Sequence, residues 1–332
     1  MITALSPALS AWLTEVHARG ECLHPTTPAE RSLVRRYQQA GLLTVPYRGL
    51  YDDTATWCAK DPHEQARTLL RTLHRLHPQW VATDIAAQDF QGIEHGRQLH
   101  TDIVTITDRG CNAAKRHTGP GAQLIRMRVP ASLDIVTVRG LPMTPTEVSV
   151  MVAVPHLPFT SALPMVDSAL RQGLSTERLE ETAAFLRRLD GYVRALLRCG
   201  DPLSENGGES YVRAVIMEMG FAAPRLQVEF RRGGRTVRVD FLWELPDGRL
   251  VVLELDGRAK YVDPAMTHGR SPAKVAVEQL DRDEFLRDCG VNTVVHVLFE
   301  EAVRRVPLQR KLVRAGVPLA PSPMVLQPTM IA

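Results

Sequence analysis

The sequence lacks the usual signatures of an exported or membrane-spanning protein. No basic segment followed by an apolar one opens the chain, and no run approaches about 18 consecutive apolar residues. The 5 cysteines are scattered singly, with neither a C-x-x-C pair nor a His-x-His partner at zinc spacing. We therefore expect a cytoplasmic protein that has reduced thiols and does not associate with membranes.

A disorder-prone composition and fibrous repeats are absent as well. Hydrophobic residues make up 44% and charged residues 23% of the 332 positions, which suits a globular protein of two or three domains. The formal net charge of +3 permits contact with nucleic acid without requiring it. Composition alone therefore leaves the function open.

A predicted β-hairpin is the most informative stretch that is present. Pro246-Asp247-Gly248 lies between two β-rich runs, and there Pro sets φ for a turn while Gly takes the left-handed position. Counting outward from this loop brings Asp240 opposite Glu254, and Asp256 shares their face because strand side chains alternate with period two. Carboxylates among apolar neighbours repel one another and lose hydration, costs that a hard divalent cation would offset. The alternative is a half-exposed hairpin whose acidic residues face water.

The elements around this hairpin complete a compact α/β pattern. A helix is predicted over residues 210–219 with Glu209 in its first turn. The helix dipole favours a carboxylate there, and this effect alone is sufficient to explain the presence of Glu209. A strand beginning at Gln227, a charged helix over 273–289 and an apolar strand over 291–299 follow in the pattern. A domain over residues 201–310 and an extended tail over 311–332 are therefore predicted.

The N-terminal residues 1–53 have the pattern of a winged-helix DNA-binding domain. Helices are predicted over 10–19 and 29–40, the second with Thr27 as N-cap, and two short strand-like pieces follow over 42–51. Four arginines would be suitably placed for phosphate contacts with DNA, three on the second helix and one at the tip of the wing: Arg31, Arg35, Arg36 and Arg48. The alternative is an ordinary helical bundle with a solvated arginine face.

Residues 54–200 are predicted to form a mixed region of helices and short strands. The expected helices cover 63–77, 146–153 and 161–172, and a further helical stretch runs from Ser175 through Cys199. Strands are expected over 102–107 and 124–129, with a hairpin edge over 135–142. The histidines of this region are not at a metal-binding spacing, and we expect surface or capping roles for His63, His74, His77 and His95.

Several short motifs resemble two known families. The order Gly-Gly-Glu209-Ser, Arg238-Val-Asp240-Phe-Leu-Trp243, Glu254-Leu-Asp256-Gly and Lys260-Tyr-Val-Asp-Pro264, before a charged helix and an apolar strand, resembles the very-short-patch-repair-like domains of the PD-(D/E)XK restriction-endonuclease-like superfamily. The upstream segments Arg48-Gly-Leu-Tyr51, Gly140-Leu-Pro-Met-Thr144 and Val166 to Leu174 are similar to actinobacterial proteins that carry an AbiE-type (type IV) antitoxin winged helix.

The resemblance implies an α/β (α+β) protein with an N-terminal winged helix, a middle antitoxin-like region and a C-terminal domain whose mixed sheet is flanked by helices. It implies that Asp240 and Glu254 bind Mg²⁺ or Mn²⁺ together with Glu209, in a deoxyribonuclease that acts on DNA. Asp256 stands in the place of the superfamily's lysine and would bind the metal instead. With Asp256 in the lysine position, the candidates for a positive charge at the site are Lys260, Lys274 and Arg282.

Two other functions remain open from the sequence. The first is an antitoxin-like transcriptional autorepressor with a catalytically inactive nuclease fold, whose protein partner would be a cognate toxin. The second is a protein-binding module in which the winged-helix pattern is purely structural.

Overall fold

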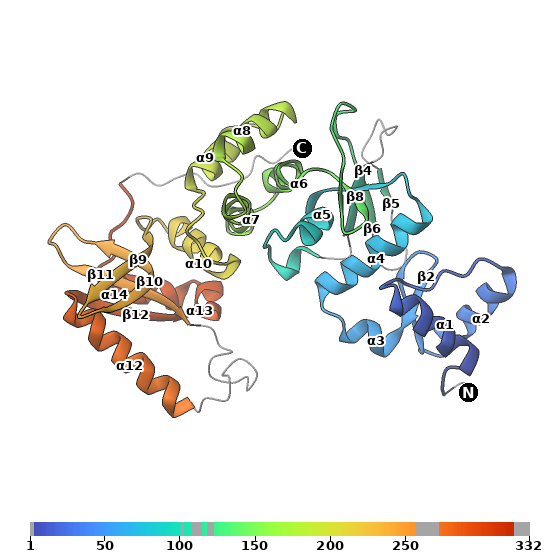
Figure 1. Cartoon of the computed structure of the whole chain (residues 1–332), viewed down its shortest axis with the longest axis horizontal. Helices are drawn as coiled ribbons and strands as arrows, with labels where there is room; N and C mark the ends of the chain where they lie inside the picture. The colour runs from blue at the N-terminus through green and yellow to red at the C-terminus, as the bar shows by residue number, and fades with distance from the viewer. Residues whose placement is uncertain (1–2, 101–102, 108–114, 118–122, 257–271, 322–332) are drawn as a thin grey trace. The chain divides into compact units, whose positions relative to one another are not determined.

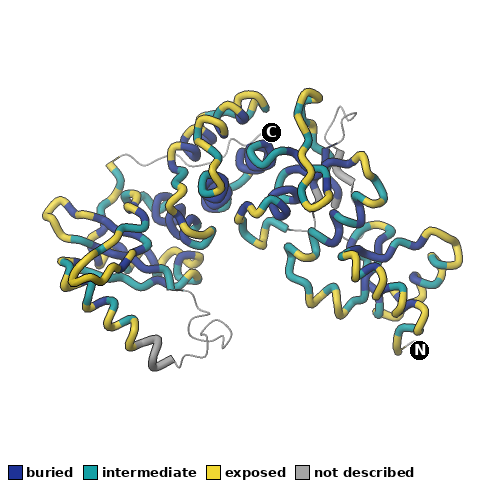
Figure 2. The backbone as a smooth tube through the Cα atoms, viewed as in Figure 1, coloured by how far each residue is buried: buried dark blue, intermediate teal, exposed yellow. Residues whose placement is uncertain are grey.

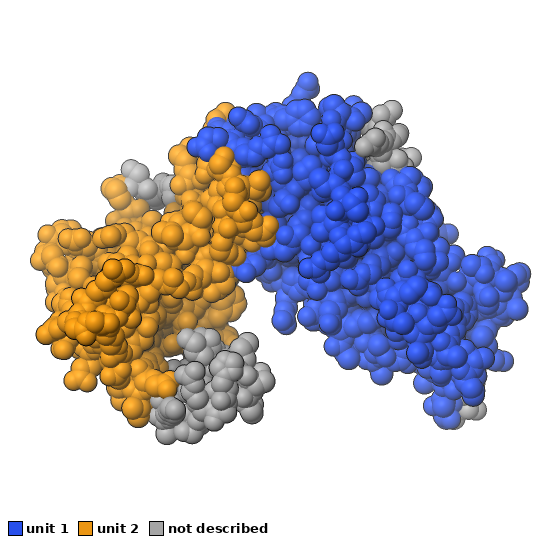
Figure 3. All heavy atoms as spheres, in the orientation of Figure 1, with its two compact units in different colours: residues 1–155, 177–189 blue, residues 156–176, 190–332 orange. Residues whose placement is uncertain are grey.

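The structure is a computed structural model, and it describes residues 3–100, 103–107, 115–117, 123–256 and 272–321. The chain forms two compact units, one made of residues 1–155 and 177–189 and the other of residues 156–176 and 190–332 (Figure 3). The boundaries predicted at 53 and 200 do not coincide with this partition. No helix in the described ranges is long and apolar enough to cross a membrane.

The N-terminal elements of the first unit follow the predicted order. Helix α1 (Pro7–Ala18) and helix α2 (Pro28–Gln39) precede a hairpin of β1 (Leu43–Tyr47) and β2 (Leu50–Asp53), and the short helix α3 (Thr54–Ala59) follows. The predicted N-cap of α2 is confirmed, since Thr27 and Glu30 form a reciprocal capping box. Residues of both helices and the hairpin share one core: Leu9, Leu13, Val16, Leu23, Val34, Tyr37 and Leu43.

The rest of the first unit is built on a six-stranded sheet in the order β5-β6-β4-β3-β8-β7. Its elements are α4 (Pro62–Leu76), β3 (Val81–Ala82), α5 (Asp84–Gln91), η1 (Arg97–Leu99), β4 (Ile103–Thr107), β5 (Lys115–His117), β6 (Gln123–Met127), β7 (Val136–Val138), β8 (Leu141–Met143) and α6 (Thr146–Ala153). The apolar stripe of α4 packs with residues of this sheet in one core.

The hairpin edge predicted over 135–142 is present as β7 and β8. Its loop consists of Arg139 and Gly140, with φ values of 49° and 81°. Left-handed backbone at both positions of a two-residue loop is what a type I′ turn requires. The Gly119-Pro120-Gly121 loop expected between the two earlier strands lies outside the described residues.

The helical stretch predicted from Ser175 through Cys199 is not continuous. Helix α8 (Thr176–Phe185) ends before Arg187, whose φ of 57° is incompatible with a right-handed helix, and α9 (Gly191–Cys199) starts again behind the N-cap Asp190. Nearly all of α8 belongs to the first unit and α9 to the second. The sequence pattern predicted the helical content but missed this break.

In the sequence of the second unit, α7 (Phe159–Arg171), α9 and α10 (Gly207–Glu218) precede the strands of a mixed sheet. The sheet has the order β12-β11-β10-β9, made of β9 (Arg225–Arg232), β10 (Arg235–Glu244), β11 (Leu250–Asp256) and β12 (Val291–Leu298) (Figure 1). Strands β9, β10 and β11 are antiparallel, whereas β12 runs parallel to β11 after the crossover helix α12 (Pro272–Asp288).

Two hydrophobic cores cover the two faces of this sheet, and the buried residues lie mainly on the central strands β10 and β11, whereas β9 and β12 are mostly half-buried or exposed (Figure 2). On one face the strands pack against α10, α13 (Phe299–Arg304) and α14 (Val306–Ala315). On the other face Val237, Val239 and Val252 pack against Leu286 of α12. The predicted mixed sheet flanked by helices is therefore confirmed.

The prediction of an extended tail from residue 311 is wrong at its start. Helix α14 continues to Ala315 and ends at Gly316, whose φ of 78° is typical of a helix C-cap. Leu319 then forms an antiparallel bridge with Phe221. The amphipathic spacing of Leu308 and Leu312, both buried, explains why the helix extends this far.

Candidate functional site

The β10–β11 hairpin has the predicted register. Gly248 has a φ of 82°, and the Leu245 N–H donates to the Arg249 carbonyl at 2.8 Å. The paired residues run from Glu244 with Leu250 to Phe241 with Leu253, so Asp240 and Glu254 stand next in register. The Leu255 N–H donates to Oδ2 of Asp240 at 2.8 Å, which fixes this carboxylate against β11.

The alternation of side chains breaks at Asp240. Residues two apart along a strand normally share a face, yet Val239 packs in the core beside α12 and Phe241 packs in the core on the opposite face. The neighbouring strand breaks at the same level, where Gln227 has a left-handed φ of 52°. Such irregularities redirect side chains and are common beside functional sites. The distortion lies at Asp240, the residue that stands opposite Glu254 in the register.

Glu254 is a buried carboxylate that forms an ion pair with Arg282. The Arg282 guanidinium of α12 donates to its Oε1 at 2.8 Å and also to the Arg238 carbonyl at 2.5 Å. Burial, with the nearby negative charge of Asp240, raises the pKa of Glu254 to about 7, although Arg282 acts in the opposite direction. Of the three cationic candidates, Arg282 is therefore the one whose contact with the site is described.

Glu209, in the first turn of α10, is the second glutamate whose carboxylate interacts with the charge of Asp240. Its carboxylate accepts hydrogen bonds from the Glu205 N–H at 2.8 Å, from Nδ2 of Asn206 at 2.6 Å and from Nε2 of Gln227 at 3.1 Å. Burial raises the pKa of Glu209 to about 7, and the charge of Asp240 contributes in the same direction. The charge of Asp240 thus acts on both buried glutamates, Glu209 and Glu254.

Asp256 has a different set of neighbours on the same face. Its Oδ2 lies 3.2 Å from Nδ1 of His296 and accepts a hydrogen bond from Nε2 of Gln279 at 3.2 Å. Nε2 of His296 lies 3.0 Å from Oδ1 of Asp283. The hydrogen bond with Asp256 is the main cause of the raised pKa of His296. Asp256 is therefore held in a carboxylate–imidazole–carboxylate arrangement beside the three coupled acids.

The four arginines predicted to contact DNA are all exposed. Arg31, Arg35 and Arg36 lie on α2, and Arg48 lies in the β1–β2 turn. Arg31 donates to the Thr26 carbonyl at 2.7 Å, and the guanidinium of Arg36 lies 5.6 Å from the ring centre of Tyr37. These contacts leave the charges at the surface, where phosphate groups have access to them.

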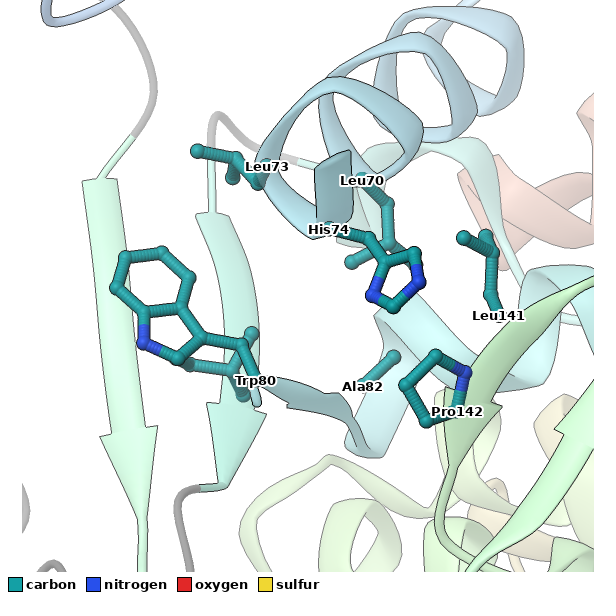
Figure 4. A pocket seen from close by; sticks show the side chains of 8 residues that line it. Leu70, Leu73, His74, Trp80, Ala82, Leu141 and Pro142 are labelled. Atoms are coloured by element: carbon teal, nitrogen blue, oxygen red, sulfur yellow. The ribbon is translucent and has the colours of Figure 1, made fainter. Parts of the chain in front are cut away.

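A small pocket of the first unit has little capacity for chemistry. It lies between α4 and the six-stranded sheet, and Figure 4 shows the His74 ring as its single ionisable group among apolar side chains. Nδ1 of His74 has no hydrogen-bond partner among the residues that the structure describes. One imidazole without a second polar group is a poor basis for binding or catalysis.

The expectation of surface or capping roles fails for His63 and His95, and His74 lines the pocket described above, whereas His77 is the C-cap of α4. Ligand atoms of His63, Asp89, His95 and His100 all lie within 4.8 Å of one another. Among the described residues, this is the group of His, Cys, Asp and Glu side chains whose ligand atoms are close enough to share one metal ion. The carboxylate oxygens of Glu209, Asp240 and Glu254 do not all lie within that distance of one another. The sequence carries no signal for the cluster, because its members have no regular spacing.

Comparison with known proteins gives no match: no protein-family model, curated protein or solved structure is similar to this chain.

Proposed function

We propose that this protein is a DNA-binding deoxyribonuclease that hydrolyses phosphodiester bonds with Mg²⁺ or Mn²⁺ at Glu209, Asp240 and Glu254. The observation that supports the proposal most directly is the electrostatic coupling of three acids from three elements. Asp240 raises the pKa of both Glu209 and Glu254, and both of those carboxylates are buried. This is an unfavourable arrangement for a purely structural role.

The donor chemistry fits a hard divalent cation. Its candidate ligands are carboxylate oxygens, the class that Mg²⁺ and Mn²⁺ prefer. A dication would lower the electrostatic cost of ionising all three acids at neutral pH. The irregular backbone at Asp240 and Gln227 also supports the proposal, since a local conformational cost of this kind is common beside functional sites.

Each residue has a distinct role in this proposal. When bound, the metal ion polarises a phosphoryl oxygen and promotes ionisation of a water molecule. Asp240 and Glu254 position the ion from adjacent strands, and Glu209 approaches from the helix. Arg282 supplies a fixed positive charge beside Glu254 in place of the superfamily's lysine. Because a guanidinium keeps its proton, Arg282 stabilises charge and transfers no proton.

Plasmid cleavage in Mg²⁺ or Mn²⁺ tests the proposal. Asp240→Asn should abolish cleavage while the protein still folds, because the asparagine oxygen can keep the hydrogen bond from the Leu255 N–H. Glu244→Gln is the matched control, since Glu244 is an exposed carboxylate of the same strand. Undiminished cleavage by the Asp240 variant would exclude this site.

A second candidate function is an antitoxin-like transcriptional autorepressor with an inactive nuclease fold. The specific observation in its favour is that Arg282 already forms an ion pair with Glu254, while Asp256 is engaged with His296. In this proposal the N-terminal elements act as a winged helix, and a cognate toxin is the protein partner.

Binding to promoter DNA distinguishes the two functions. Replacing Arg35 and Arg36 with Ala should weaken binding and reduce the slope of log affinity against log salt by about 2, one for each lost phosphate contact. Arg314→Ala is the control, because Arg314 is an exposed arginine of α14. Repression that survives Asp240→Asn, with no cleavage by the wild type, would favour the autorepressor over the nuclease.

A further inference from the structure

We propose that His63, Asp89, His95 and His100 form a structural Zn²⁺ site, separate from the carboxylates of the second unit. The four residues come from α4, from α5 and from the segment that follows α5. Three imidazole nitrogens and one carboxylate oxygen are a donor set that zinc binds in tetrahedral geometry. Four protein ligands fill that geometry, which is typical of structural zinc rather than catalytic zinc.

The distances within the cluster suit one small cation. Nδ1 of His63 lies 2.7 Å from Oδ1 of Asp89, and Nε2 of His95 lies 2.8 Å from Nε2 of His100. Nε2 of His100 is 3.9 Å from the same Asp89 oxygen. Ligands about 2.0–2.1 Å from a tetrahedral zinc ion lie roughly 3.3 Å apart. Shifts of about half an ångström in side-chain position would therefore give the required geometry.

The surroundings orient two of the ligands. Nδ1 of His95 lies 2.8 Å from the Ile93 carbonyl, an acceptor, so this nitrogen carries the proton and Nε2 presents a lone pair to the cluster. Arg67 donates to both oxygens of Asp89, from Nε to Oδ2 at 2.6 Å and from Nη2 to Oδ1 at 3.3 Å, which fixes the carboxylate beside His63. Such outer hydrogen bonds to an imidazole and a carboxylate are regular features of metal sites.

Two of the four side chains in the cluster are deeply buried. The side chains of His100 and Asp89 are only 2% and 3% exposed. Three imidazoles in mutual contact, with ring centres 4.5–5.1 Å apart, are otherwise an uncommon way to fill a protein interior.

The site would give the segment from Gly92 to His100 a fixed position. This segment contains only the short η1 helix between α5 and β4, so its backbone has little regular hydrogen bonding of its own. Zinc bound to His95 and His100 would attach it to His63 and Asp89 on the two helices. The proposed role is therefore to stabilise the first unit.

Titration of the untagged, full-length protein with Co²⁺ after chelation tests the proposal. Tetrahedral Co²⁺ gives intense visible absorption, which should appear with one ion per chain and disappear on addition of Zn²⁺. His95→Ala and the more conservative His100→Gln should each weaken Co²⁺ binding by more than about 100-fold. His24→Ala, at a histidine outside the cluster, and Asp240→Asn should leave the absorption unchanged.

Two results would overturn the proposal. One is weak octahedral absorption in place of tetrahedral bands, and the other is equal Co²⁺ affinity of the His24 and His95 variants. In either case Arg67 and Asp89 would hold the histidines by hydrogen bonds alone. If both cluster variants fail to fold, the wild type decides: chelation should lower its melting temperature and Zn²⁺ should restore it, and no change on chelation refutes the site.

Discussion

Replacing Asp240 with Asn should stabilise the metal-free protein while it abolishes the response to divalent cations. The carboxylate of Asp240 opposes the ionisation of two buried neighbours, Glu209 and Glu254. An amide of nearly the same shape removes that repulsion and can keep the hydrogen bond from the Leu255 N–H. Function and stability are thus expected to conflict at this position.

The magnitude follows from the two raised pKa values. Both glutamates have a pKa of about 7 in the folded protein, against an ordinary value of 4.5. At about 1.4 kcal/mol per pKa unit, ionising each one at pH 8 costs roughly 3 kcal/mol of folding free energy as an upper limit. Burial causes most of this cost and persists in the variant. Asp240→Asn should therefore recover about 1 kcal/mol.

The sign of the pH dependence is fixed by the direction of these changes. A carboxyl group whose pKa is raised on folding contributes stability below its unfolded pKa and loses it as pH rises through the folded pKa. In the wild type this loss falls between about pH 4.5 and 7 and is essentially complete at pH 8. The advantage of Asp240→Asn over the wild type should accordingly be small at pH 5.5 and largest at pH 8.

Urea unfolding in the presence of a chelator at both pH values measures this difference. Glu244→Gln, which removes an exposed carboxylate from the same strand, should show no comparable gain. Adding Mg²⁺ or Mn²⁺ at pH 8 should stabilise the wild type and the Glu244 variant but leave Asp240→Asn unchanged. A variant that is less stable than the wild type at pH 8 without metal would refute the argument.

Three further substitutions test the folded framework, each by urea unfolding. The buried guanidinium of Arg213 lies 2.7 Å from the carboxylate of Asp167, and Asp167→Ala leaves it without a counter-ion. This variant should lose about 3–5 kcal/mol of unfolding free energy, and a loss below about 1 kcal/mol would contradict the reasoning. Thr27→Ala removes the capping box of α2 and should cost about 1 kcal/mol, whereas Thr27→Ser should be nearly neutral. Gly140→Ala should also cost about 1 kcal/mol, through its left-handed φ of 81° alone, because open space surrounds the added methyl group.

Local chemistry made much of the fold predictable. The turn residues Pro246-Asp247-Gly248 determine both the loop and the register of the hairpin, so the pairing of Asp240 with Glu254 follows by counting. Thr27 followed by Pro28 and Glu30 determines where α2 starts. Such features depend on neighbours a few residues away, and the sequence displays them directly.

The parts that escaped prediction depend on contacts between distant residues. The break in side-chain alternation at Asp240 coincides with left-handed backbone at Gln227, a residue type with no preference for that backbone strong enough to reveal it. His100 meets His63 across 37 positions of the chain, with no repeated spacing for a pattern search to detect. The sequence offered three cationic candidates near the carboxylates. Only the packing of α12 beside Glu254 shows that Arg282 contacts one of them.

The interleaving of the two units has a consequence for the order in which the protein matures during translation. The chain passes between the units three times, after residues 155, 176 and 189. Helix α7 therefore emerges from the ribosome before the first unit is complete, and its buried partner Arg213 follows Asp167 by 46 residues. Until α10 has been synthesised, α7 exposes an apolar surface that other chains can bind. A nascent chain halted near residue 200 should consequently require a chaperone or aggregate.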